Sequence, residues 1–419
     1  MSPRLACAAL VLTSVVARAA DAQSTAPDTS GPPPAVTTAL SYTGELVSDA
    51  SGGAQRGVVY TGVAGAQLTL SLSRLVGWRH ARLFIYALDA HGDAPSTLVG
   101  DVQGVSNLES PPGVRMEEWW LQQNMLAGRV SLLAGRYDLG TEFYVLQSGN
   151  LFLNGSFGMG PEFGLSGVEG PSTFPFTAVG ARLDAKPSPN SVVRAAVLDG
   201  VPVDRPGGGI HLFAPGDGAL VVGEVAILAR PDTAAAPRGR RFQVGRGLAR
   251  MYSRKVAIGA WYYTARFPDL VDTLPSGAPV EHSGSGGAYL ITDQTLWTAR
   301  SGVPGPLMAF VQLGLGDGRV NQVGSYVGAG LTLTGPVRRR AKDVVGFGVA
   351  AARNGSHFVS AQAALGVVAA GETAIELTYV AQFGAWLTVQ PDVQYVLSPG
   401  GTRATLNALV PGLRIGVSH

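Results

Sequence analysis

The sequence predicts an all-β protein: a transmembrane, antiparallel, up-and-down β-barrel of about sixteen strands, with one loop folded into its bore. The clearest evidence is the residue alternation near the C-terminus. From Glu372 to Gln382 apolar and polar side chains alternate, and residues 387–395 and 409–417 repeat the pattern. A side-chain period of two indicates a β-strand. Each of these strands therefore has one apolar face and one polar face.

Composition favours a membrane barrel over a soluble β-sandwich. Only 14% of the 419 residues are charged, 46% are hydrophobic and 57 are glycine. Beyond the N-terminal segment, no apolar run reaches the roughly 18 residues that a membrane-spanning helix needs. Amphipathic strands without spanning helices fit an outer-membrane barrel, apolar toward lipid and polar toward water. The formal net charge of +2 gives no reason to expect nucleic acid as a partner.

The N-terminus has the parts of a secretory signal peptide, expected at residues 1–22. Arg4 precedes an apolar run that begins at Leu5, and Ala20-Asp21-Ala22 offers a cleavage site. The only cysteine, Cys7, lies in this segment, so we expect no disulfide in the mature chain. Residues 23–36, rich in Ser, Thr, Asp and Pro, are predicted to be a disordered lead-in, and residues 37–419 the barrel.

Strand-like segments then follow one another to the C-terminus. They are expected at residues 37–49, 57–72, 81–91, 114–126, 129–138, 173–184, 191–199, 218–228, 255–266, 284–297, 307–316, 320–334 and 343–352, before the three C-terminal strands. The total is about sixteen, and an even number is typical of bacterial barrels.

The connections alternate between short and long, as expected for periplasmic turns and external loops. Residues 229–254 are the exception, because this predicted periplasmic connection is long and basic. Residues 139–172 form the longest loop and show no sustained periodicity. A long loop without secondary structure is usually functional. We therefore expect it to fold inward and constrict the bore.

Several blocks of the sequence resemble the carbohydrate-selective porins of the OprB type. They include Glu118-Trp119-Trp120-Leu121-Gln122-Gln123, Ala134-Gly135-Arg136-Tyr137-Asp138-Leu139, Leu151-Phe152-Leu153-Asn154-Gly155-Ser156-Phe157-Gly158 and Gln390-Pro391-Asp392-Val393-Gln394-Tyr395. The blocks occur in the family's order over nearly all of the mature chain. The resemblance implies a sixteen-stranded outer-membrane channel that passes sugars by diffusion through a loop-narrowed pore. The C-terminal His419 departs from the aromatic residue, usually Phe, on which such barrels tend to end.

A sugar channel needs a water-filled bore, a constriction and weak hydroxyl-binding groups. In the constriction loop Glu142, Asn154 and Glu162 are candidates to bind sugar hydroxyls. The loop aromatics could offer ring faces to sugars or only anchor the loop on the wall; they are Phe143, Phe152, Phe157 and Phe163.

A second set of candidates consists of wall residues on the polar face of each predicted strand, which should point toward the bore. They are Glu118, Trp120, Gln122, Arg136, Asp138, Arg182, Asp184, Glu224, Glu376, Asp392, Gln394 and Arg414. Arginines facing carboxylates could clamp hydroxyls, or could form ion pairs that only hold the barrel's shape. Outward parity assigns aromatic residues to the lipid interfaces, namely Trp119, Tyr137, Tyr379 and Tyr395.

Catalytic motifs are lacking in the sequence: there is no HExxH, GxSxG or P-loop. We therefore expect no enzyme activity, cofactor or metal, and small sugars such as glucose as solutes. The alternatives are a general or anion-biased porin for small organic acids, an outer-membrane or periplasmic enzyme, and a soluble secreted binding protein. The expected partners are sugars, outer-membrane lipid and the barrel assembly machinery; homo-oligomer formation stays open.

Overall fold

The computed structural model describes residues 34–202, 212–229, 252–298 and 304–418. In this part of the chain sixteen long strands and the three-residue β2 (Ser51–Gly53) form one sheet. The long strands are β1 Val36–Asp49, β3 Gly57–Ser71, β4 Ala81–Gly92, β5 Gly113–Met125, β6 Val130–Tyr137, β7 Ala178–Ser188, β8 Ser191–Asp199, β9 Ala219–Ala229, β10 Arg254–Thr273, β11 Pro279–Trp297, β12 Leu307–Gly316, β13 Val323–Thr334, β14 Val344–Asn354, β15 Glu372–Phe383, β16 Leu387–Leu397 and β17 Leu406–Ser418. The predicted signal peptide, nearly all of the lead-in, most of the 229–254 connection and His419 lie outside the described residues.

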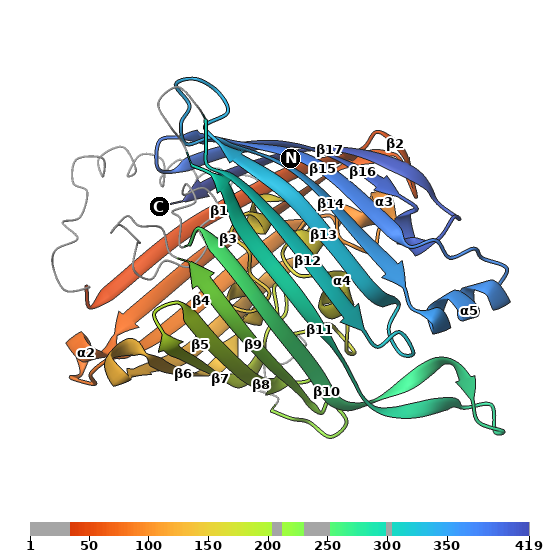
Figure 1. Cartoon of the computed structure of the whole chain (residues 1–419), viewed down its shortest axis with the longest axis horizontal. Coiled ribbons are helices and arrows are strands. Elements are labelled where there is room, and N and C mark those ends of the chain that lie inside the picture. Colours follow the sequence, from red (N-terminus) through yellow and green to blue (C-terminus); the bar gives the residue numbers. More distant parts are fainter. Residues whose placement is uncertain (1–33, 203–211, 230–251, 299–303, 419) are drawn as a thin grey trace, which may run out of the picture.

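The sheet closes on itself as an antiparallel barrel. Each long strand pairs with its sequence neighbours, and β1 pairs with both β3 and β17. Tyr42 of β1, for example, lies opposite Val417 of β17 on one side and Ala64 of β3 on the other. The N-terminal and C-terminal strands therefore meet side by side (Figure 1). Closure leaves no open sheet edge, which is what a strand-built membrane protein requires.

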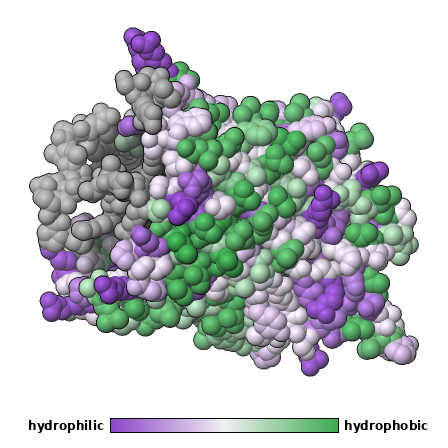
Figure 2. All heavy atoms as spheres, viewed as in Figure 1, coloured by the Kyte–Doolittle hydropathy of each residue, from purple (hydrophilic) through white to green (hydrophobic). Residues whose placement is uncertain are grey.

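The wall shows the alternation that the sequence predicts. Along β10, buried residues such as Ala257, Trp261 and Tyr263 alternate with exposed ones such as Ile258 and Tyr262. Apolar side chains gather over the middle of the visible wall in Figure 2. An outward apolar surface is stable only against lipid, so this surface is the membrane-facing one. None of the helices in the described ranges is long and apolar enough to cross a membrane.

The connections at the two ends of the barrel differ. One end carries short turns, including α2 (Leu72–Leu75) and η2 (Leu126–Gly128). The other carries longer loops, with α3 (Ser96–Val99), α5 (Ser356–Ala364), η6 (Pro399–Gly401) and a tall β10–β11 hairpin (Figure 1). By the usual rule the loop end faces the cell exterior.

Several predicted strand boundaries are wrong, most of all at β7 and in the β10–β11 hairpin. β7 begins at Ala178 rather than at residue 173, because Pro171 and Pro175 cannot donate to a sheet ladder. The expected loop at residues 267–283 is mostly hairpin: β10 runs to Thr273 and β11 starts at Pro279. Beyond Tyr263, β10 pairs only with β11, so the hairpin projects past the barrel wall (Figure 1). The prolines and polar residues of this hairpin are typical of a loop, which explains the wrong prediction.

The predicted lipid-facing position of Tyr137 is also wrong. Tyr137 is fully buried, and its hydroxyl donates to Glu142 Oε2 at 2.8 Å. Leu133 shares its inward parity on β6, so the inner face of this strand is apolar where the constriction loop covers it. Arg136 consequently has the parity of the exposed Leu132, and its Nε donates to Thr177 Oγ1 at 2.9 Å.

Candidate functional site

The loop between β6 and β7 lies inside the barrel, as predicted. It contains three short 3-10 turns, η3 (Leu139–Thr141), η4 (Gly149–Leu151) and η5 (Gly155–Phe157), and the single-turn helix α4 (Pro161–Gly164). Asp138 begins the loop by accepting a hydrogen bond from Gly140 N at 2.8 Å. Most of the loop's side chains are buried against the wall.

Carboxylates on the wall hold the loop through its backbone. Glu224 of β9 accepts the N–H of Tyr144 at 3.0 Å. Asp293 of β11 accepts Ser148 N at 3.1 Å and its hydroxyl at 2.7 Å. Glu376 of β15 accepts Leu153 N at 2.7 Å and Asn154 N at 3.0 Å. Each of these three side chains accepts hydrogen bonds from the loop, so they act as clamps that hold it against the wall.

Aromatic packing fastens the same loop. Phe152, Phe157 and the wall residue Phe310 form one cluster with ring centroids 4.5 to 5.8 Å apart. Phe163 stacks on Trp261 of β10 at 4.2 Å. All four loop phenylalanines named above are buried, so they anchor the loop and present no ring face to the channel.

A second loop, residues 93–112 between β4 and β5, also enters the bore, which the sequence reasoning missed. Glu372 of β15 accepts Val102 N at 2.8 Å and Gln103 N at 2.9 Å. The two loops bond to each other, because Gly155 N donates to Gly104 O and Asn107 N to Leu153 O, each at 2.7 Å. Glu372 shares its parity with Glu376 on β15, so alternation could have found this clamp.

A cavity of about 870 Å³ runs along the barrel between these loops and the opposite wall. Its lining reaches from Gln382 and Ser418 at the short-turn end to Ser96 and Glu109 at the loop end. Most of its polar lining is neutral, including Gln67, Gln103, Asn107, Asn150, Thr388 and Gln390. The charged lining residues are Asp101, Glu109, Asp138, Lys342 and Arg414.

Two predicted wall residues, Asp138 and Arg414, line this cavity directly. Arg414 also pairs with buried Glu45, with Nη2 and Oε2 2.6 Å apart. Glu224 and Glu376 serve as loop clamps. Gln394 donates to Val105 O at 2.7 Å and accepts from the Asn154 amide at 3.1 Å, so it joins both loops to the wall. Asp392 accepts from Gln394 Nε2 at 3.2 Å.

The remaining candidates lie in buried polar networks. Arg182 pairs with Glu142 at 2.7 Å. Arg194, which the sequence reasoning did not select, pairs with Asp184 at 2.8 Å and reaches Glu224 at 3.4 Å. Trp120 stacks on Phe84 and donates to Glu118 at 3.2 Å, while Gln122 accepts from Arg82 at 2.6 Å. Paired cations contribute little net positive charge to the bore.

Glu162 is a buried carboxyl group of the constriction loop with one unpartnered oxygen. It is fully buried on the loop; one oxygen accepts from Tyr144 Oη at 2.9 Å and the other, Oε2, has no hydrogen-bond partner in the structure. Burial raises its pKa to about 7, although the Tyr144 hydrogen bond opposes that rise. It fits against the wall because Gly314 has no Cβ, which would lie 1.8 Å from the carboxylate.

A family profile described as carbohydrate-selective porin, OprB family, matches residues 55–418. The chain belongs to this family. Porin B of Pseudomonas aeruginosa is 23% identical over 408 residues, which cover 90% of this chain and 86% of that protein. The high-pH structure of Pseudomonas putida OprB superposes with a TM-score of 0.78 at 23% identity, covering 92% and 94% of the two chains. The DcaP channel of Acinetobacter baumannii is more distant, with a TM-score of 0.53 at 10% identity and coverages of 92% and 97%.

OprB-family membership confirms the predictions of an outer-membrane location and a sugar-selective porin. The structural likeness confirms the sixteen-stranded antiparallel barrel. The family is one of channels that are selective for carbohydrates.

Proposed function

We propose that this porin passes small neutral sugars such as glucose by passive diffusion and catalyses no reaction. The observation that supports this most directly is the lining of the cavity, in which amides and hydroxyls outnumber charges. Such groups exchange hydrogen bonds with sugar hydroxyls without a strong charge that would trap the solute.

The predicted site residues divide into two groups under this proposal. Asp138 and Arg414 contact the solute, together with neutral neighbours such as Gln103 and Gln390, because they line the cavity. Several of the others hold the constriction in shape: they clamp the loop, as Glu224 and Glu376 do, or neutralise one another, as Arg182 and Glu142 do.

The alternative of an anion-biased channel finds less support. Among the five charged lining residues three are acidic, namely Asp101, Glu109 and Asp138. Of the two cationic ones, Arg414 is already paired with Glu45. A bore with this charge pattern has no row of unpaired cationic side chains to attract small organic acids.

Swelling of proteoliposomes in isosmotic glucose or gluconate tests the proposal, because these solutes match in size and differ in charge. We expect glucose to enter several times faster than gluconate at moderate salt. Gluconate entering as fast as glucose, or faster, would contradict the proposal. Liposomes without protein give the background rate.

A further inference from the structure

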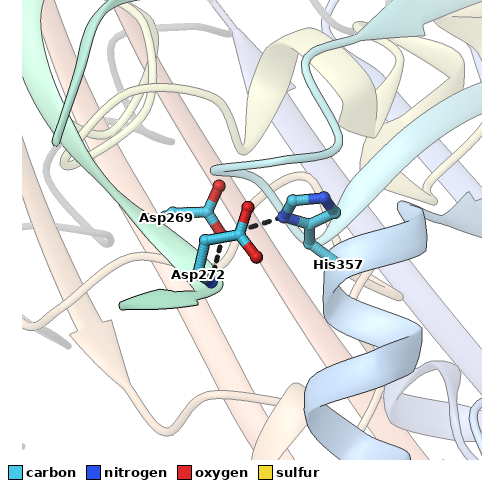
Figure 3. A group of neighbouring side chains, drawn as sticks. All are labelled: Asp269, Asp272 and His357. Carbon is cyan, nitrogen blue, oxygen red and sulfur yellow. Dashed lines mark hydrogen bonds and ion pairs between the residues drawn. The ribbon is translucent and has the colours of Figure 1, made fainter. Parts of the chain in front are cut away.

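Two of the chain's six histidines contact the carboxylate of Asp269, beyond the loop end of the barrel. Asp269 lies on the projecting part of β10, His282 on β11, and His357 in the first turn of α5. Asp269 Oδ2 lies 2.7 Å from His282 Nε2, and its Oδ1 lies 2.8 Å from His357 Nδ1. Asp272, at the end of β10, lies beside Asp269 and His357 (Figure 3).

The donor atoms of this cluster are close enough for one metal ion. The ligand atoms of Asp269, Asp272 and His357 all lie within 4.8 Å of one another. Tetrahedral zinc with bonds near 2.1 Å places its donor atoms about 3.4 Å apart. His357 Nδ1 and Asp269 Oδ1, which are 2.8 Å apart, would have to separate by about 0.6 Å, and exposed Asp272 would have to approach by up to about 1.4 Å. Within the described residues no other group of three such side chains comes this close.

The surroundings of Asp269 also fit a ligand. Its side chain is inaccessible to solvent, while those of His282 and His357 are 21% and 25% exposed. The backbone N–H groups of Val271 and Asp272 each donate to Oδ1 at 2.8 Å, which fixes the carboxylate in place. The carboxylate is therefore held in position by its four hydrogen-bond partners.

We propose that Asp269, Asp272 and His357 form a binding site for a divalent transition-metal ion, with zinc the best match. Imidazole nitrogen and carboxylate oxygen without thiolate is a donor set that zinc accepts, whereas calcium and magnesium prefer oxygen alone. His282 forms a hydrogen bond with Oδ2 of Asp269. Side chains around a metal site commonly orient its ligands in this way. When Nδ1 of His357 binds the ion, the proton on that nitrogen is released to solvent or replaced by one on Nε2.

A metal here would join two external loops that are far apart in sequence. Asp269 and Asp272 belong to the β10–β11 hairpin, and His357 belongs to the β14–β15 connection, whose helix α5 packs beside β10. The ion would thus brace the loop end of the barrel independently of the sugar path, since none of these residues lines the cavity.

Titration calorimetry of untagged, chelator-treated protein in detergent tests the site, with ZnCl2 and, separately, MgCl2 as the probes. We expect one zinc ion per chain and no heat of binding with magnesium. His357→Ala and Asp272→Ala should abolish zinc binding, and His282→Gln should weaken it about 10- to 100-fold. Zinc should also raise the Tm of the wild type and leave that of His357→Ala unchanged.

His91→Ala is the matched control. His91 lies on β4 with its Nδ1 3.9 Å from Asp89, so it has a carboxylate neighbour and no third ligand. This variant should bind zinc as the wild type does. Circular dichroism checks that every variant keeps its β-barrel spectrum, and Asp272→Ala changes only an exposed side chain. Wild type that binds no zinc, or His357→Ala that binds it with unchanged affinity, would overturn the proposal.

Discussion

At the scale of single residues, wall glycines make room for the aromatic side chains of the constriction loop. A Cβ at Gly348 would lie 2.8 Å from the ring of Phe157 and 3.0 Å from that of Phe152. A Cβ at Gly346 would meet Leu151 at 2.6 Å. The loop can pack this closely only because the facing strand has no side chain at these points.

Gly348→Ala should therefore destabilise the barrel by about 1–3 kcal/mol, the usual cost of overpacking a core. Its matched control is Gly223→Ala on β9, where the nearest atom to the added Cβ is 3.9 Å away. That change should be neutral or slightly stabilising, because alanine restricts the unfolded chain more than glycine does. Thermal unfolding in detergent compares the two, and equal Tm values would refute the packing argument.

Glu162 gives the constriction loop a pH dependence. Its pKa in the folded protein, about 7, is raised from 4.5, so folding favours the neutral acid. The stability that this residue contributes is complete below pH 4.5 and is lost as the pH rises through 7. Raising the pH from 5 to 8 should therefore lower the Tm of wild type more than that of Glu162→Gln. Identical pH profiles for the two proteins would argue against a neutral Glu162.

At the scale of elements, the constriction loop is held by carboxylates on three strands, β9, β11 and β15. Glu376→Gln keeps the shape of one clamp but replaces one of its two acceptor oxygens by an amide N–H₂, which faces one of the two loop N–H groups. Leaving a buried N–H without an acceptor costs about 1–3 kcal/mol, so the loop should loosen and the constriction widen.

Proteoliposome swelling with glucose and with the trisaccharide raffinose measures this widening. In Glu376→Gln the ratio of glucose to raffinose rates should fall severalfold. Glu281→Gln, at an exposed position of the β10–β11 hairpin, should keep the wild-type ratio. An unchanged ratio in Glu376→Gln would show that this clamp does not set the width of the constriction.

The strands could be predicted from the sequence because lipid and water act on alternate residues of each one. The inserted loops obey no such period. Residues 139–172 stood out by length, whereas residues 93–112 did not, although Glu372 and the first loop hold both segments inside the bore. Tyr137 was misassigned for the same reason: the inner face of β6 is apolar because the loop covers it, and alternation alone cannot show that cover.

At the scale of the whole molecule, a closed barrel separates two surfaces with different solvents. The outer surface is apolar over its middle (Figure 2), and the inner one is lined by amides, hydroxyls and paired charges. Inward parity correctly identified Glu224, Glu376 and Arg414 as facing the interior. Their partners could not be read from parity, because these depend on where the inserted loops come to rest.

The most direct test of the central claim is the ion current through single channels in a planar bilayer as glucose is added. A bore whose neutral polar lining binds sugar should show a current that falls and saturates with glucose concentration. Gluconate at the same concentration should reduce it far less. A current that glucose leaves unchanged, while gluconate blocks it, would contradict the account of a sugar-selective path between the two inserted loops and the wall.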